Sequence, residues 1–103
     1  MSVVEHRGTP AIGLTGFQRD LLAAVAHEET AIGLEIKEIL ERHYGEVNHG
    51  RLYPNLDALV EHEFITKQPK SRRAFHYSIT DEGRYALEQH ADWLDGCLEG
   101  DEA

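Results

Sequence analysis

Side chains of the types that proteins use to contact DNA are gathered in one short stretch of the chain. Residues 48–62 read NHGRLYPNLDALVEH, and their leucines recur at the spacing of an amphipathic helix. The opposite side carries Arg, Asn, Tyr and His, which hydrogen-bond to base edges and phosphates. The pattern predicts a helix that packs on a core and presents polar groups to the major groove. The residues assigned to this contact are His49, Gly50, Arg51, Tyr53 and Asn55.

A basic cluster follows this helix. Residues 64–79 contain two β-prone stretches, roughly 64–68 and 75–79, which predict a hairpin. A wing at 69–74, with its positive charges at the tip, can contact the DNA backbone or the minor groove. A solvated turn would carry such residues too, so the distribution of charge decides between the two interpretations. The hairpin residues assigned to DNA are Lys67, Lys70, Ser71, Arg72 and Arg73.

The charge of the chain is divided unevenly along its length. The formal net charge is −9, which is unusual for a protein that binds a polyanion. Residues 1–47 carry −4 and residues 78–103 carry −7, whereas residues 48–77 carry +2. The predicted helix and wing are therefore the one net-positive segment of an acidic chain. This favours phosphate binding over a merely solvated turn.

The surrounding elements predict a mainly α fold with a small β-hairpin wing. Thr15 and Gln18 form a capping-box pattern for a first helix, and a second helix begins at Gly33 and ends at Gly45. A short strand at 30–32 could pair with the hairpin. Helix, basic hairpin and helix is the order of a winged helix-turn-helix. The predicted units are a flexible N-terminal arm (1–13), a winged-helix domain (14–79), a dimerisation helix (80–98) and an acidic tail (99–103).

The final helix is expected to join two copies of the chain. Its apolar residues repeat at four-three-four spacing, which is the seam of a coiled-coil-like pair. A helix packed on its own core could show the same stripe. Three helices and a hairpin already enclose a small core, however, so the stripe is predicted to pack against the same stripe of a second copy. The seam residues are Leu87, Ala91, Leu94 and Leu98.

Three motifs resemble the PadR-like family of transcriptional regulators. They are G-R-L-Y-P-N-L-D-A-L at 50–59, R-R-A-F-H-Y-S-I at 72–79 and T-D-E-G at 80–83. The resemblance covers roughly residues 14–98 and implies a dimeric winged-helix repressor with its third helix in the major groove. It is similar to the subgroup with a single C-terminal helix. The chain departs from the usual pattern in its acidity and in Asn48, where a serine commonly caps the helix.

The acidity itself resembles that of proteins from salt-accumulating archaea. The chain has only three lysines against seven arginines, and acidic residues occur in every segment. An ordinary acidic cytosolic protein is the alternative. At molar salt the Debye length falls to about 3 Å, so phosphate contacts are heavily screened. Shape fit, base contacts and bridging cations at the DNA interface would then carry more of the affinity, with Glu46 and Asp57 as candidate cation holders.

Length and composition exclude several classes of protein. At 103 residues the chain suits a single domain, and it has neither an apolar run long enough for a membrane span nor a signal peptide. We therefore expect a cytoplasmic protein. Nucleophile motifs, phosphate loops and carboxylate dyads are missing, which argues against an enzyme.

The lone cysteine and the histidines give no strong site. Cys97 is interpreted as a small buried apolar residue, although a disulfide between two copies is the alternative. The histidines lack the spacing of a helical metal pair, so no metal and no other cofactor is predicted. A composite site across a dimer, using His90 with Cys97 or with acidic residues of the final helix, is the alternative.

Two functions follow from these observations. The first is a sequence-specific transcriptional regulator that binds double-stranded DNA as a homodimer on a pseudo-palindromic operator. The second is a winged-helix protein-interaction module that does not bind DNA, which the acidity supports. The basic wing favours the first function, because a protein-docking surface has little need for Lys70, Arg72 and Arg73 together.

Overall fold

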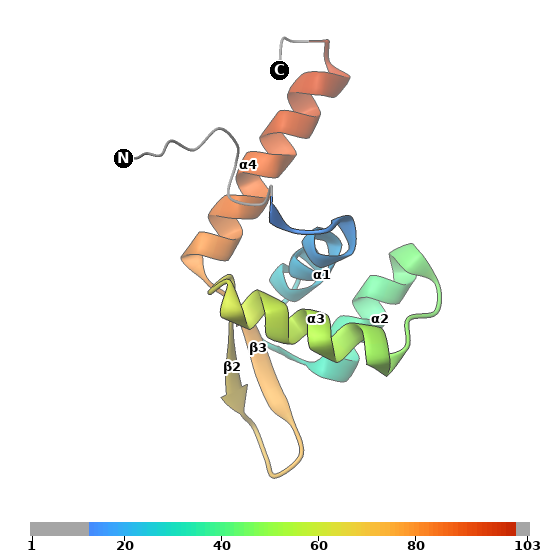
Figure 1. Cartoon of the computed structure of the whole chain (residues 1–103), viewed down its shortest axis with the longest axis vertical. Helices are drawn as coiled ribbons and strands as arrows, with labels where there is room; N and C mark the ends of the chain where they lie inside the picture. The colour runs from blue at the N-terminus through green and yellow to red at the C-terminus, as the bar shows by residue number, and fades with distance from the viewer. Residues whose placement is uncertain (1–12, 101–103) are drawn as a thin grey trace.

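The computed structural model describes residues 13–100, which form four helices and a three-stranded sheet (Figure 1). The predicted mainly α fold with a hairpin wing is confirmed. The predicted N-terminal arm falls almost wholly on residues 1–12, and most of the acidic tail on 101–103, outside the described part. The elements are α1 (Gly16–Ala26), β1 (Ala31–Ile32), α2 (Gly33–Tyr44), α3 (His49–Glu61), β2 (Ile65–Pro69), β3 (Phe75–Ile79) and α4 (Asp81–Leu98).

Side-chain caps fix the starts of three helices. At α1, the Thr15 hydroxyl accepts from the backbone N–H of Gln18, and the side-chain amide oxygen of Gln18 accepts from the backbone N–H of Thr15, both at 3.1 Å. This is the predicted capping box. Asn48 and Thr80 accept in the same way from the N–H three residues further on, at 2.9 and 3.0 Å. The predicted starts of α3 and α4 are therefore confirmed, and Asn48 serves as the cap in place of a serine.

The sheet has the strand order β1-β3-β2 and is antiparallel throughout. The predicted short strand is confirmed, because Ala31 pairs with Tyr77 of β3. Strands β2 and β3 pair from Ile65 and Ile79 outward to Pro69 and Phe75. The hairpin extends away from the helices as the wing, and the free end of α4 points to the opposite end of the molecule (Figure 1).

The core lies between the first three helices and the inner part of the sheet. Helix α1 has contacts with α2, α3, α4 and β3, so it forms the centre of the packing. Pro54 lies inside α3, where it cannot donate a hydrogen bond to the carbonyl of Gly50, yet the helix continues to Glu61. The largest fully buried side chains are Leu21, Leu22, Val25, Ile36, Leu52, Leu56, Leu59 and Ile65.

Close backbone contacts link the end of α3 to the starts of β2 and α4. The Phe64 carbonyl accepts from the Thr80 N–H at 2.9 Å, and the Thr80 hydroxyl donates to the Glu63 carbonyl at 2.7 Å. Glu63 turns the chain with a φ of 64°. Gly83 lies directly against the Phe64 carbonyl, where a Cβ atom would overlap the backbone oxygen. The helix with the predicted DNA contacts, the wing and α4 thus meet at one backbone junction.

We expect Gly83→Ala to lower the free energy of unfolding by about 1–3 kcal/mol, because the added methyl group must displace backbone. Urea denaturation followed by circular dichroism measures this. Gly96→Ala is the matched control: it lies in the same helix, an added Cβ there meets nothing within 4 Å, and helix propensity should make it neutral or stabilising. Equal stability of the two variants would contradict the close packing at Gly83.

Candidate nucleic-acid interface

Helix α3 is fixed by packing along its inner face and by hydrogen bonds in the turn before it. Leu52, Leu56 and Leu59 are fully buried and fix its inner face on the core. The turn before the helix is fixed by Glu41, whose carboxylate accepts from the Val47 N–H at 2.8 Å and from Lys37 at 3.0 Å. These two hydrogen bonds hold the pKa of Glu41 below its ordinary value. The position of α3 is therefore fixed at its start and along its inner face.

The outward front of α3 is a row of four exposed residues, each about one turn from the next. Gly50, Pro54, Asp57 and Glu61 follow the i, i+4, i+7, i+11 spacing of one helix face, and all four are exposed. We call this set the front row. Its first two members have no hydrogen-bonding side chain, and its last two are carboxylates. The sequence prediction included Gly50 but did not identify the row.

Arg51 and Asn55 lie on one flank of α3, against α1. The guanidinium carbon of Arg51 lies 3.9 Å from the centre of the Phe17 ring, a stacking distance that restrains this long side chain. The Asn55 amide donates to the Arg51 carbonyl at 2.7 Å and accepts from the Gln18 amide at 3.0 Å. Arg51 remains exposed. Asn55 can reach a base only by giving up bonds within the protein, and its predicted role stays a prediction.

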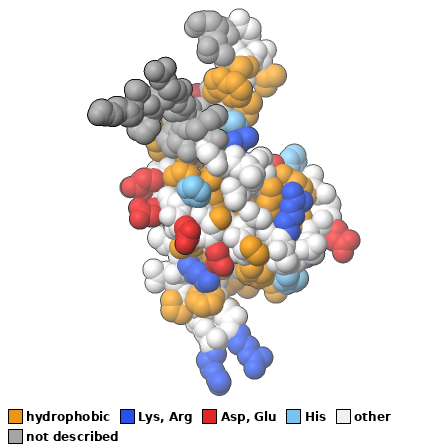
Figure 2. All heavy atoms as spheres, viewed as in Figure 1, with side chains coloured by type: hydrophobic (Ala, Val, Ile, Leu, Met, Phe, Trp, Pro, Cys, Tyr) orange, Lys and Arg blue, Asp and Glu red, His pale blue; other side chains and the backbone are white. Residues whose placement is uncertain are grey.

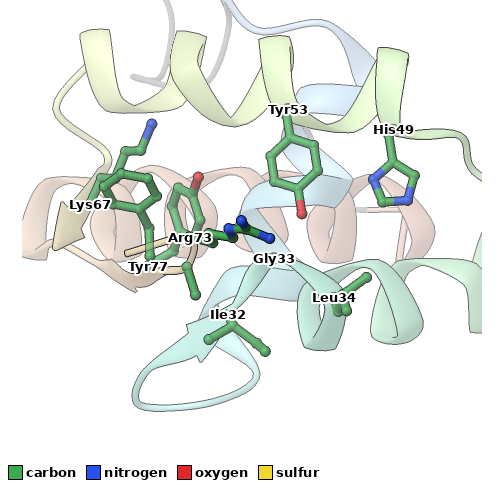
Figure 3. Close-up of a pocket in the computed structure, with 10 residues that line it drawn as sticks. Ile32, Gly33, Leu34, His49, Tyr53, Lys67, Arg73 and Tyr77 are labelled. Carbon is green, nitrogen blue, oxygen red and sulfur yellow. The ribbon is translucent and has the colours of Figure 1, made fainter. Parts of the chain in front are cut away.

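His49 and Tyr53 lie on the other flank, which faces the wing. Their rings stack with centres 5.7 Å apart, and the Tyr53 hydroxyl points at Gly33, where an added Cβ atom would force the tyrosine ring to move (Figure 3). A cavity of about 450 Å³ opens between this flank, the start of α2 and the wing. The cavity brings four of the predicted DNA-contacting residues together. Its lining is Ile32, Gly33, Leu34, His49, Tyr53, Lys67, Arg73, Ala74, Phe75 and Tyr77.

The wing presents its basic residues at the tip. Lys70, Ser71, Arg72 and Arg73 are all exposed, and Lys and Arg side chains gather at the end of the hairpin in Figure 2. The turn is closed by the Ala74 carbonyl, which accepts from two backbone N–H groups of the tip at 2.9 and 3.2 Å. A closed turn leaves the side chains as the parts free to contact a phosphate.

Lys67 lies on strand β2, further from the tip of the wing, and contacts other side chains of the protein. Its ammonium is 3.5 Å from the Asp57 carboxylate and 4.4 Å from the centre of the Phe75 ring. This pair joins the front row of α3 to strand β2. The two groups of residues predicted to contact DNA therefore border one continuous surface. The Asp57–Lys67 contact could not be predicted from the sequence, because spacing does not give the register of the hairpin against α3.

Helix α4 leaves the core after its first half. Gly83 and Ala86 are buried and Leu87 packs partly against the core, but Leu94 and Leu98 are 42% and 84% exposed. Trp93 beside them is 50% exposed. The end of the helix thus presents large apolar side chains that the other residues of the described range 13–100 do not cover. The seam predicted for a dimer stays a prediction, with Leu87 serving the core as well.

The expected burial of Cys97 is wrong for the single chain. Cys97 is exposed, because it lies on the half of α4 that stands clear of the core.

Within residues 13–100, no helix combines the length and apolarity that crossing a membrane requires.

The architecture defines the class of protein. Three packed helices, a short strand that pairs with a two-stranded wing, and an exposed face on the third helix make a winged helix-turn-helix of the DNA-binding type. The chain belongs to the PadR-like family of transcriptional regulators, whose family model matches residues 21–89. Members of this family are regulators and not enzymes.

Solved structures of RosR show substantial sequence identity to the chain. RosR of the halophilic archaeon H. salinarum is 45% identical, covers 82% of this chain and 76% of its own, and superposes with a TM-score of 0.76. The hsRosR-S1 complex is 44% identical, with 84% and 77% of the two chains covered and a TM-score of 0.76. The halophilic archaeal kinship indicated by the acidity is thereby confirmed.

A more distant match supports the fold alone. F93 from STIV, a winged-helix DNA-binding protein, is 12% identical, with 82% of this chain and 92% of that chain covered, and has a TM-score of 0.66. No curated protein matches the chain at a significant level.

Proposed function

We propose that this regulator binds a pseudo-palindromic operator as a homodimer, in the cytoplasm of a cell that works at high salt. Helix α3 enters the major groove, and the wing lies on the neighbouring backbone or in the minor groove. The contact between Asp57 and Lys67 carries this proposal, because it sets the front of α3 and the wing along one surface. A surface that spans helix and wing suits a DNA duplex, with the helix in a groove and the wing beside it.

The side chains have separate roles in this proposal. His49, Arg51 and Tyr53 border the front row of α3 and contact bases or the phosphates at the groove edge. Gly50 lets the backbone approach closely, and Asn55 contributes if DNA displaces Gln18. Lys70, Ser71, Arg72 and Arg73 at the tip hold the backbone and position the domain.

The proposed dimer forms through α4. Trp93, Leu94 and Leu98 are exposed at the end of the helix, and large apolar side chains clustered on a surface mark interaction sites. Pairing two α4 helices along the seam of Leu87, Ala91, Leu94 and Leu98 would bury them. A two-fold dimer places two α3 helices about one DNA turn, or a multiple of it, apart.

Selection from random DNA tests this function. The wild-type protein, incubated with random duplexes in molar KCl, should enrich a consensus of two inverted half-sites. Failure to enrich any sequence, at several salt concentrations, would contradict sequence-specific binding. That result would favour the alternative of a winged-helix module that docks on protein.

We also expect an unusual dependence of binding on salt. A conventional repressor releases counterions from phosphates, so its affinity falls steeply as salt rises. Here the segments that flank residues 48–77 carry −4 and −7 in each chain, and these charges repel DNA unless cations are retained or taken up. A plot of log affinity against log KCl concentration should therefore be shallow or rise. A steep decline would show that the acidity does not act at the interface and serves solubility alone.

A further inference from the structure

We propose that Asp57 reads a base, accepting a hydrogen bond from the N4 amino group of cytosine, and that Lys67 positions it. This assignment rests on the proposed function, because it requires the front row of α3 to lie in the major groove. Asp57 was identified from the sequence only as a candidate cation holder. Its position in the structure gives it a different role.

Asp57 is the third residue of the front row of α3. Gly50 and Pro54, two turns and one turn earlier on the same face, lack side-chain donors and acceptors and let the start of α3 approach a groove floor closely. Asp57 is therefore the first side chain along this row that can hydrogen-bond. With 61% of its side chain exposed, it is accessible to a ligand.

The chemistry of a carboxylate narrows the choice of base. An ionised aspartate only accepts hydrogen bonds, so phosphates and the acceptor edges of guanine repel it. In the major groove, donors are the amino groups of cytosine and adenine. Adenine places its N7 acceptor beside the amino group, which disfavours a second acceptor. Cytosine is therefore the preferred partner.

Lys67 makes an acidic side chain compatible with this surface. Its ammonium lies 3.5 Å from the carboxylate and rests over the Phe75 ring, so it approaches Asp57 from the wing. The positive charge partly offsets the repulsion between Asp57 and the phosphates that border the groove. It also restricts the rotamers of the carboxylate, and Lys67 is therefore a positioning residue.

The alternative role for Asp57 is to weaken DNA binding. In that case the carboxylate would hold Lys67 away from phosphates, and its removal would raise affinity for every DNA sequence alike. Glu61 separates the two roles, because it lies one turn further along the same exposed row and carries the same charge. Glu61→Gln removes one negative charge from the front of α3 without touching Asp57.

The test is selection from random DNA with the wild type, Asp57→Ala, Asp57→Asn and Glu61→Gln, followed by affinity measurements on the selected sites. Asp57→Ala should lose about tenfold of the preference for cytosine at one position of each half-site, while its affinity for random DNA rises. Asp57→Asn should prefer adenine there, since an amide both donates and accepts. Glu61→Gln should bind all sequences more tightly and keep the cytosine.

Three results would overturn the assignment. If the wild type enriches a consensus that Asp57→Ala also enriches unchanged, Asp57 reads no base although the regulator binds specifically. If Asp57→Ala raises affinity by the same factor on all sites, Asp57 only weakens DNA binding and reads no base. If the wild type enriches no sequence, the proposed function fails, and the role of Asp57 fails with it.

Discussion

Leu94→Asp is expected to convert the protein into monomers and to lower its affinity for the operator by about 10²–10⁴-fold. Leu94 lies at the middle of the apolar end of α4, where a partner helix would surround it. Burying an aspartate there without a counter-charge opposes association. A monomer then loses the second half-site, which in a dimer binds at the high effective concentration of a linked module.

Light scattering at molar KCl and binding to a selected operator measure the two effects. Gly96→Asp is the control, since it introduces the same charge two residues later at a position where an added Cβ meets nothing within 4 Å. It should remain dimeric and bind normally. A monomeric wild type, or a dimeric Leu94→Asp variant with full affinity, would contradict dimerisation through this seam.

The double variant Arg72→Ala with Arg73→Ala should weaken binding to all DNA by roughly 10²-fold. Each exposed guanidinium at the wing tip is expected to bind a phosphate, and a dimer loses four of them, so a roughly threefold loss for each, about 0.7 kcal/mol, gives this factor. The loss should be the same for operator and random DNA, because phosphates carry no sequence information. Circular dichroism and light scattering should show an unchanged fold and dimer.

The control for the wing removes the same charge elsewhere. Arg42→Ala with Arg84→Ala takes two exposed arginines from α2 and α4, away from the wing. Both double variants change the net charge equally, so a loss confined to the wing variant identifies a local contact. Unchanged affinity of the wing variant would refute the wing model and strengthen the protein-docking alternative.

Much of the fold could be predicted because its signals are local. Thr15, Asn48 and Thr80 cap their helices through hydrogen bonds to residues three positions away, and such bonds are visible as sequence spacing. The basic tip of the wing was equally clear. The order of the elements followed from these local patterns, and the family resemblance indicated that Pro54 is tolerated in α3.

The details of the site depended on how α3 is rotated against the core. The sequence separated its polar side from its leucines, but it could not tell the front of that side from its flanks. Arg51 and Asn55 lie on the flank that packs on α1, whereas Asp57 lies in front and contacts Lys67. Cys97 was wrongly predicted as buried, since apolar spacing cannot show where a helix leaves its own core.

A methylation-interference and hydroxyl-radical footprint of the wild-type protein on its selected operator tests whether a dimer reads two half-sites with α3. Methylation of guanine N7 reports contact in the major groove, and sugar cleavage reports coverage of the backbone. We expect two symmetric patches of major-groove interference about one helical turn or a multiple apart, each flanked by protected sugars under a wing. A single patch, or backbone protection that does not depend on sequence, would contradict a dimer that reads two half-sites with α3.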